Sequence, residues 1–366
     1  MKEVFIIFII ALLIAVFGVI SIYSSNYHKE GEPWQSIYKR QIFWVCLGTL
    51  LFFLMALSDY RRLWDWAYFL YLFVIGLLLL VFLLGAIRLG AQRWLHIAWF
   101  NLQPSEIAKP AIVILLARYF SKKTLFELSS STAQSGFLRS FFIPFLFVLI
   151  PAGLIIEQPD LGSGMLIIFI LVTMIFAAGV KLRYLLILAG IGLTSLPIFW
   201  HFLHSYQRDR IMVFLNPNID PLGAGYTIIQ AKIAIGSGGF FGKGWLSGTQ
   251  SQLHFLPESH TDFIFSTFAE EWGFLGVGIL LIFYFLILRL IIRAAEMVHD
   301  PFGKFLALGI TLMVGIQILI NLAMNMGFAP VVGIPLPLMS YGGSSIIATF
   351  FSLGIAASIC RSSNYA

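Results

Sequence analysis

The chain has 366 residues, of which 59% are hydrophobic and 11% charged, and its formal net charge is +6. Average soluble proteins contain about 45–50% apolar and about 25% charged residues, so this composition excludes a soluble globular protein. The positive charge is spread over many loops without a basic tract, which argues against nucleic-acid binding. Cys46 and Cys360, the only cysteines, lie far apart in apolar runs, which argues against a disulfide scaffold.

Apolar runs of about 20 residues, the length that crosses the hydrocarbon core of a bilayer, recur along the chain. The sequence therefore predicts an all-α polytopic membrane protein that forms one integral membrane domain over residues 1–366. The first run has no clear cleavage site and is interpreted as a retained helix. In chain order, about ten transmembrane helices are predicted at 4–22, 42–57, 66–87, 105–120, 138–156, 161–180, 184–203, 262–292, 304–326 and 339–360.

The distribution of Lys and Arg orients this bundle. With the N-terminus in the cytoplasm, the inner loops hold most of the basic residues, including Arg61, Arg118 and Arg289. Because basic residues favour the cytoplasmic side, both termini are predicted to be cytoplasmic. Residues 204–261 then form one long extracytoplasmic loop. Its stretch 226–235 predicts a helix that lies at the membrane interface or re-enters the bundle.

Two further segments interrupt the apolar pattern. Residues 93–100 contain two tryptophans and are predicted to lie at headgroup level, either as part of the site or simply as surface packing. Residues 333–345 contain two prolines and three glycines, which predict a broken start to the last helix. Irregular backbone at membrane depth is tolerated where it is buried in protein or lines a cavity, so this segment either only breaks the helix or borders a site.

A few ionisable side chains fall near membrane depth, where each costs roughly 2.5–3.5 kcal/mol on insertion scales unless it is paired or hydrated. Glu106 and Lys109 lie three positions apart on one helical face. Asp160 follows the fifth predicted helix and Asp262 opens the eighth, so all four fall near the outer leaflet. They are candidates for a functional site. The alternatives are buried ion pairs that fix helix packing and, for Asp262, a carboxylate that stabilises a helix N-terminus.

Other acidic residues and familiar motifs are less informative. Glu270 and Glu271 lie two turns further into the eighth helix and are interpreted as structural. Residues 237–244 superficially resemble a phosphate-binding loop, but they lack its first glycine and its final Ser or Thr. The histidines have no zinc-binding spacing, and the chain contains no G-x-S-x-G sequence.

Five motifs occur in order along the chain: Gln92–Trp94, Gln103–Lys109, Gln158–Gly162, the loop from Gly223 to Phe265, and Pro335–Gly343. They resemble, in the same order, those of the SEDS (shape, elongation, division, sporulation) family of bacterial cell-wall polymerases. The resemblance covers nearly the whole chain. Within the family, the run Gly248–Leu253 and the very short tails resemble the elongation branch more than the division branch.

The resemblance implies a peptidoglycan glycosyltransferase that acts during cell elongation and rod-shape maintenance. Its substrate would be lipid II, a disaccharide-peptide on undecaprenyl pyrophosphate, which it joins to a growing glycan through β-1,4 bonds. Asp262 matches the essential carboxylate of the family and would act as general base on the acceptor hydroxyl, a role that a raised pKa would favour. The resemblance also implies that the protein lies in the inner membrane of a bacterium, with its active site facing outward.

The remaining candidates are expected to bind the substrate. Cationic side chains would neutralise the departing pyrophosphate, and Glu106 would hold Lys109 in place. Asp160 would orient a basic group or help bind a divalent cation such as Mg²⁺ or Mn²⁺, although no ligand set is legible. The substrate-binding candidates are Trp94, Glu106, Lys109, Asp160, Arg208, Arg210, Lys232, Glu258 and His260.

The chain has no transpeptidase signature, so peptide cross-linking must come from another protein. The resemblance implies a class B penicillin-binding protein as partner, with other elongation proteins such as MreC and MreD nearby. Two other functions stay open. A lipid II transporter suits polar groups inside a bundle, although their clustering near one leaflet disfavours alternating access. A non-catalytic scaffold for other wall enzymes is the second.

Overall fold

A computed structural model describes residues 1–27, 36–88, 91–97, 100–122, 134–180, 205–220 and 223–363, with isolated positions between 183 and 203. Six of its helices are long and apolar enough to cross a membrane: α1 (Lys2–Ser25), α3 (Ile37–Leu57), α4 (Arg62–Leu84), α13 (Ile264–Met297), α14 (Pro301–Met326) and α15 (Gly343–Ser363). Three others are α5 (Pro104–Ser121), α7 (Gln134–Glu157) and α8 (Leu161–Ala177). Nine of the ten predicted spans therefore coincide with helices. The seventh, 184–203, falls mostly outside the described residues.

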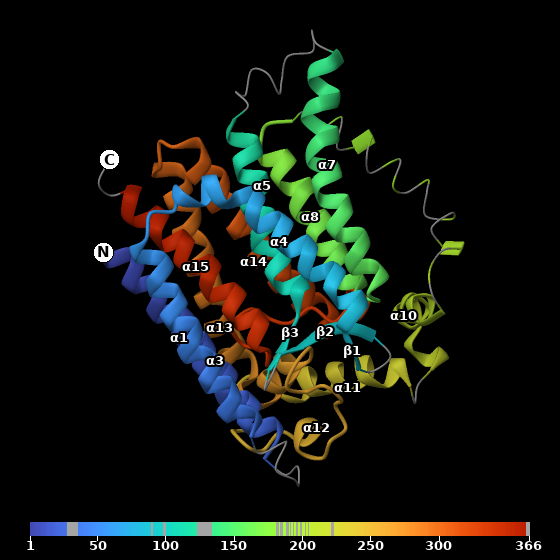
Figure 1. Ribbon diagram of the computed structural model, residues 1–366. Coiled ribbons are helices and arrows are strands. Elements are labelled where there is room, and N and C mark those ends of the chain that lie inside the picture. Colours follow the sequence, from blue (N-terminus) through green and yellow to red (C-terminus); the bar gives the residue numbers. More distant parts are fainter. Residues whose placement is uncertain are drawn as a thin grey trace.

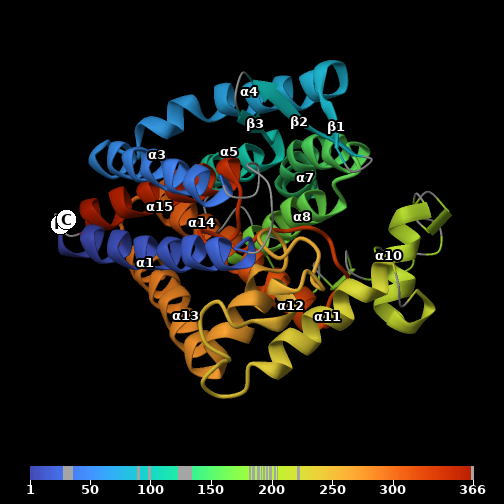
Figure 2. The ribbon, with the colours of Figure 1, turned by 90° about the horizontal axis from the view of Figure 1, so that it is seen from below.

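The helices form a bundle around α15, and the protein is a polytopic membrane protein as predicted (Figure 1). α15 contacts α1, α3, α5, α13 and α14, and 83% of its apolar window is buried, against 28% for α3, α4 and α13. Figures 1 and 2 place both chain termini at one end of the bundle, which we call the terminal end. The helices of the long loop and a small β-sheet lie toward the opposite end.

Basic side chains cap helices at the terminal end. Arg361 donates from Nη1 to the carbonyl of Leu57 (2.9 Å) and from Nη2 to that of Ser58 (3.1 Å), at the C-terminus of α3. Arg118, in the last turn of α5, instead donates to the carbonyl of Trp64 in the first turn of α4 and so joins two helix ends. Cations near helix C-termini satisfy orphan carbonyls and the helix dipole. The structure thus gathers residues that the charge distribution assigns to one side. That this side is the cytoplasm stays a prediction.

The segment between α4 and α5 is a local exception in this helical fold. It forms an antiparallel sheet of β1 (Ala86–Arg88), β2 (Ala91–Ile97) and β3 (Phe100–Leu102), in the order β1-β2-β3. Residues 93–97, assigned above to a surface segment at headgroup level, are therefore a strand. Leu95, which pairs with Leu102, is buried, whereas His96 is exposed, and this alternation is typical of a half-buried strand. The sheet delivers the chain directly to Pro104, the first residue of α5.

The long loop is structured, as predicted. It contains α10 (Ser205–Leu215), a 3₁₀ turn η1 (Pro217–Ile219), α11 (Ala224–Ser237) and α12 (Thr249–Gln252). The helix predicted at 226–235 is confirmed as part of α11. That helix packs on both α13 and α14, which fixes the loop to the bundle.

The chain that follows α11 enters a break in α13. We call residues 238–252, which include α12, the strap. At the break, Gly273 has φ 63° and ψ −164°, so the helical hydrogen bonds around it are lost. The strap replaces them: Lys243 N–H donates to Glu270 O (3.0 Å), Gly244 N–H to Glu271 O (3.0 Å), Phe274 N–H to Gly239 O (2.9 Å) and Leu275 N–H to Phe240 O (3.1 Å). The strap and α13 approach too closely at Gly242 for any side chain, since a Cβ there would lie 2.1 Å from Glu271 O.

Candidate active site

Asp262 lies just before α13, at the end of the bundle away from the termini. Two buried asparagines one turn apart on α14 hold its backbone, since Asn321 Nδ2 and Asn325 Nδ2 donate to the Asp262 carbonyl at 3.1 and 3.0 Å. Asn325 also accepts from Ser266 at 2.6 Å. The position of the Asp262 main chain is therefore set by α14, and sequence reasoning missed both asparagines.

The broken segment before α15 runs beside Asp262. Ser340 Oγ donates to the carbonyl of Thr261 (2.7 Å), and Tyr341 N–H donates to that of His260 (2.9 Å). Gly333, at φ +72°, lies so near the carboxylate that a Cβ there would be 3.5 Å from Asp262 Oδ2. The irregular backbone predicted at 333–345 is confirmed up to α15, and it borders the candidate site rather than only breaking a helix.

The surroundings of Asp262 favour a carboxyl group that exchanges protons near neutrality. Its pKa is raised from 3.8 to about 6, first because burial disfavours the charged form and then because Glu258 is close. Arg210 lowers this pKa, Asp160 raises it, and Arg93 lowers it. A general base is most effective when its pKa lies near the working pH.

This pKa predicts a pH profile for any reaction in which Asp262 accepts a proton. Because the raised pKa keeps the carboxyl protonated up to about pH 6, activity should fall below that pH. One pH unit lower, the rate should be about tenfold reduced. Glu258→Gln removes a negative neighbour that raises the pKa, so its acid limb should shift to lower pH. The measurement is the rate against pH for both proteins, and an unshifted limb in the variant would contradict the assignment.

Asp160 joins the N-terminal ends of α5 and α8 beside this site. It caps α8, accepting from Ser163 N–H at 3.2 Å, and its other oxygen accepts from Ser105 Oγ (3.1 Å) and Gln103 Nε2 (3.3 Å). These partners are neutral donors. The hydrogen bonds of Asp160 therefore do not support the prediction that it orients a basic group. Arg93 is nearby all the same, because its guanidinium donates to the carbonyls of Gln158 and Pro159.

Glu106 and Lys109 form the predicted pair. Lys109 Nζ lies 2.6 Å from Glu106 Oε1, and both side chains are only 2–3% exposed. They lie on α5 directly after Ser105, which contacts Asp160. The spacing of three residues was therefore a reliable guide to the contact, and it places a buried cation one helical turn beyond the Asp160 network.

The three basic candidates of the long loop separate in the structure. Arg210 donates to the carbonyl of Val331 at 3.0 Å and acts electrostatically on Asp262. Arg208 instead donates to the carbonyl of His201, and exposed Lys232 packs against Gly327 at the end of α14. The structure thus brings Arg210 to Asp262.

Three further candidates lie around the site in different environments. Trp94 pairs with Ala86 in the sheet. Glu258 is exposed and accepts from Thr261 Oγ1 at 2.9 Å, whereas His260 is buried with its ring 5.8 Å from that of Tyr341. The residue next to Trp94, Arg93, was missed as a candidate. The signal was present, because Arg93 is the charged member of the Gln92–Trp94 motif.

No cluster of three or more His, Cys, Asp or Glu side chains occurs among the residues that the structure describes. Mg²⁺ is commonly held by only one or two carboxylates together with substrate phosphates.

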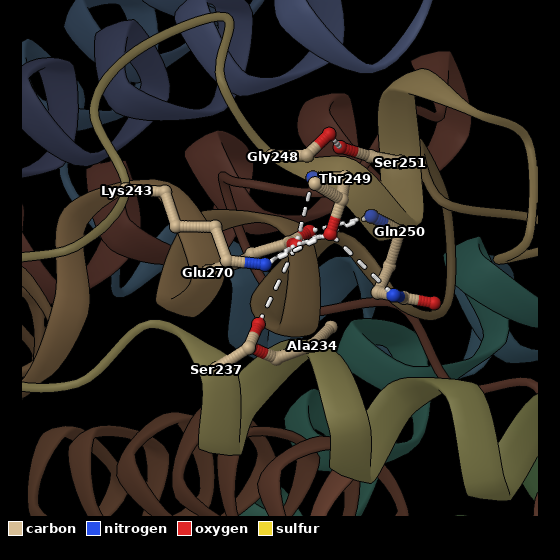
Figure 3. Close-up of polar contacts among 8 residues, drawn as sticks. All are labelled: Ala234, Ser237, Lys243, Gly248, Thr249, Gln250, Ser251 and Glu270. Atoms are coloured by element: carbon tan, nitrogen blue, oxygen red, sulfur yellow. Dashed lines mark hydrogen bonds and ion pairs between the residues drawn. The ribbon is translucent and has the colours of Figure 1, made fainter.

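Glu270 sits in a second polar cluster and has a clear packing role (Figure 3). Its carboxylate is fully buried and accepts from the N–H groups of Thr249 (2.8 Å) and Gln250 (3.1 Å), the first residues of α12. Lys243 Nζ lies 2.7 Å away and neutralises it. The neighbouring Glu271 accepts from Ser24 Oγ on α1. These contacts join the strap and α1 to α13, in keeping with the structural interpretation.

Comparison with known proteins agrees with this architecture. The chain is 40% identical over 352 residues to the peptidoglycan glycosyltransferase MrdB of Escherichia coli strain K12, covering 96% of this chain and 91% of that protein. It is 36% identical over 358 residues to a probable peptidoglycan glycosyltransferase FtsW of a Geobacter species (strain M18), covering 96% and 94%.

Two solved structures have the same fold. One is a chain from a peptidoglycan synthase complex that coordinates polymerization and crosslinking, with TM-score 0.81, 31% identity and 98% of each chain covered. Another is the rod shape determining protein RodA of Thermus thermophilus, with TM-score 0.70, 30% identity and 97% and 95% coverage. Residues 4–365 match the family of FtsW, RodA and SpoVE, described as cell cycle proteins. The SEDS resemblance is thus confirmed, and the chain belongs to the FtsW/RodA/SpoVE family.

Proposed function

We propose that the chain is a peptidoglycan glycosyltransferase that polymerises lipid II into glycan strands during cell elongation. The observation that carries the proposal is Asp262, a partly buried carboxyl group with a pKa of about 6 that two arginines face at one end of a membrane bundle. The names of its relatives, MrdB and RodA, support the reaction and the elongation role.

In this reaction the 4-hydroxyl oxygen of the acceptor sugar attacks the anomeric carbon of the donor. Its proton passes to a carboxylate oxygen of Asp262 as the β-1,4 bond forms. The bond from the anomeric carbon to the pyrophosphate oxygen breaks, and undecaprenyl pyrophosphate leaves with the bonding electron pair. Asp262 returns the proton to solvent before the next cycle. General-base assistance of this kind contributes about 10²–10⁴ to the rate.

Cationic groups near Asp262 would stabilise the charge that develops on the leaving pyrophosphate. Arg210 and Arg93 are close enough to lower the pKa of Asp262. Lys109, held by Glu106, supplies a further buried positive charge on α5. Charges fixed before the reaction begins stabilise the transition state without reorganisation, which is why such groups are effective. Asp160 would help to hold a divalent cation such as Mg²⁺ or Mn²⁺, which would supply further positive charge for the leaving pyrophosphate.

The proposal also fixes an orientation. Lipid II is consumed where the wall is built. In the inner membrane, the end of the bundle with Asp262 therefore faces outward and the terminal end faces the cytoplasm. The basic residues Arg61, Arg118 and Arg361 near the terminal end support this orientation.

The test is the purified protein in lipid nanodiscs with labelled lipid II. We expect glycan polymer and released undecaprenyl pyrophosphate, with polymer digestible by a muramidase. In liposomes, transbilayer movement of labelled lipid II without polymer would support a transporter instead. Neither polymer nor movement, with and without a class B penicillin-binding protein, would support a scaffold.

A groove between α13 and α14 offers a site for that partner. It has a volume of about 380 Å³ and an almost wholly apolar lining that includes Leu288, Ile292, Gly315 and Leu319. Small residues such as Gly315 allow transmembrane helices to approach closely. The single membrane helix of a class B penicillin-binding protein fits this chemistry, and the related chain solved in a synthase complex supports such a partner.

Filling this groove should weaken the complex. We expect Gly315→Leu to reduce co-purification with the class B penicillin-binding protein while polymerisation by the isolated chain is retained. Gly278→Leu on α13 is the matched control, because a Cβ at Gly278 meets nothing within 4 Å. Equal co-purification of the two variants would contradict this docking site.

A further inference from the structure

The strap carries almost no charge on its surface. Between residues 238 and 252 the only ionisable side chain is that of Lys243. Its ammonium is paired with the fully buried Glu270 at 2.7 Å and also donates to Thr249 Oγ1 at 2.8 Å (Figure 3). A charged group in contact with lipid is costly unless it is paired, so this pairing removes the main obstacle to lipid contact.

Much of the strap's backbone is also satisfied internally. Residues 239, 240, 243 and 244 exchange four main-chain hydrogen bonds with the broken part of α13. Non-helical backbone is tolerated at membrane depth only where protein or a water-filled cavity satisfies its polar groups. Here the main-chain N–H and C=O groups that the helix break leaves unpaired form hydrogen bonds with those of the strap.

What the strap presents outward is aromatic. Phe241 is 77% exposed and Phe240 and Trp245 are about half exposed. The ring of Phe240 lies 4.9 Å from that of Phe241 and 5.8 Å from that of Phe274 on α13, which is itself 68% exposed. The strap therefore continues the exposed apolar face of a membrane helix, and Figure 2 shows it at the edge of the bundle beside α13.

The depth of this patch can be placed along α13. Arg293 lies 19 positions after Phe274 in the same helix. At about 1.5 Å per residue this is about 29 Å, close to the roughly 30 Å thickness of the hydrocarbon core. If Arg293 marks one boundary, Phe274 and the strap lie at the other. At that boundary, the ring centroid of Trp245 lies 6.1 Å from that of Tyr23, whose ring packs edge-on against Tyr38. Such a cluster is typical of an interfacial aromatic belt.

We propose that the strap is a membrane-contacting segment whose aromatic tip, Phe240–Trp245, lies in the lipid at the boundary between headgroups and acyl chains. The partner is the bilayer itself. The Lys243–Glu270 pair makes this position possible, because the buried carboxylate neutralises the strap's one charge. The strap thereby anchors the chain leading to Asp262 to the membrane surface as well as to α13.

Site-directed fluorescence tests the placement. In a Cys46→Ala, Cys360→Ala background, Phe241→Cys is labelled with an environment-sensitive dye and the protein is placed in nanodiscs without any partner. We expect blue-shifted emission, quenching by lipids with a nitroxide high on the acyl chain, and protection from iodide. Leu72→Cys on the exposed face of α4 is the lipid control, and Asn218→Cys in η1 is the water control. Equal iodide quenching of the dyes at positions 241 and 218 would overturn the proposal. The exposed aromatic patch would then be a contact site for a protein partner.

A second measurement tests the role of the ion pair. In the labelled Phe241→Cys protein, Glu270→Gln leaves the Lys243 charge unpaired, and we expect red-shifted emission and loss of protection from iodide. The double variant Lys243→Gln, Glu270→Gln is neutral and should restore both signals. If the dye at position 241 is as exposed to water in the double variant as in the single variant, packing by Glu270 sets the strap's position. The argument from charge neutralisation then fails.

Discussion

Replacing Asp262 with asparagine should abolish glycan synthesis without unfolding the protein. Loss of a general base predicts a rate lower by about 10²–10⁴. The same change should leave the melting temperature equal or higher. Because the pKa is raised from 3.8 to about 6, the ionised carboxylate is less stable in the folded protein than in the unfolded chain, by at most about 3 kcal/mol near neutrality. Removing the charge removes that cost.

The measurements are polymerisation of purified lipid II and thermal unfolding in the same detergent or nanodisc. Asp220→Asn, an exposed aspartate that caps Gly223 in the same loop, is the matched control and should polymerise normally. An Asp262→Asn protein that is folded and makes glycan at the normal rate would refute the role of Asp262 as base. A lower melting temperature would refute the account of its burial.

Lys109→Met should destabilise the protein strongly. The change leaves Glu106 as an unpaired carboxylate that is 2% exposed, and breaking a buried pair in this way typically costs about 3–5 kcal/mol. Polymerisation should also be lost, because the variant removes a positive charge proposed to stabilise the leaving pyrophosphate. Thermal unfolding and the lipid II assay measure the two effects separately.

The double variant Glu106→Gln, Lys109→Met distinguishes packing from chemistry. It replaces the pair by neutral side chains of similar size, so most of the lost stability should return. Activity should stay low because the cation is still absent. Recovery of normal polymerisation in the double variant would assign the pair to helix packing alone.

The sequence predicted the helices better than the connections between them. Apolar runs locate α1, α4 and α14 within a few residues, because each is long enough to require a bilayer or a core. The β-sheet was missed because tryptophan content was given more weight than the alternation of buried Leu95 and exposed His96. The break in α13 was missed as well, since one glycine in an apolar helix gives no sign that another segment enters there.

Within the site, local patterns were informative and long-range contacts were not. The spacing of Glu106 and Lys109 predicted a pair on one helical face, and Asp160 stands where a helix begins. Asn321 and Asn325 bond to a residue about 60 positions earlier in the chain, and only the fold brings them to it. A polar pair four apart in an apolar helix was nevertheless a usable signal. The roles of these residues in binding and catalysis stay predictions.

The break in α13 has a consequence for how the protein is assembled. In an unbroken helix Glu270 O would accept from Phe274 N–H and Glu271 O from Leu275 N–H, and these are the same four groups that the strap engages. The nascent α13 can therefore enter the membrane as a continuous rod with every main-chain group paired. Opening α13 at Gly273 exchanges two internal hydrogen bonds for four to residues 239–244. An unbroken α13 and a docked strap therefore exclude one another, because both need the same four main-chain groups.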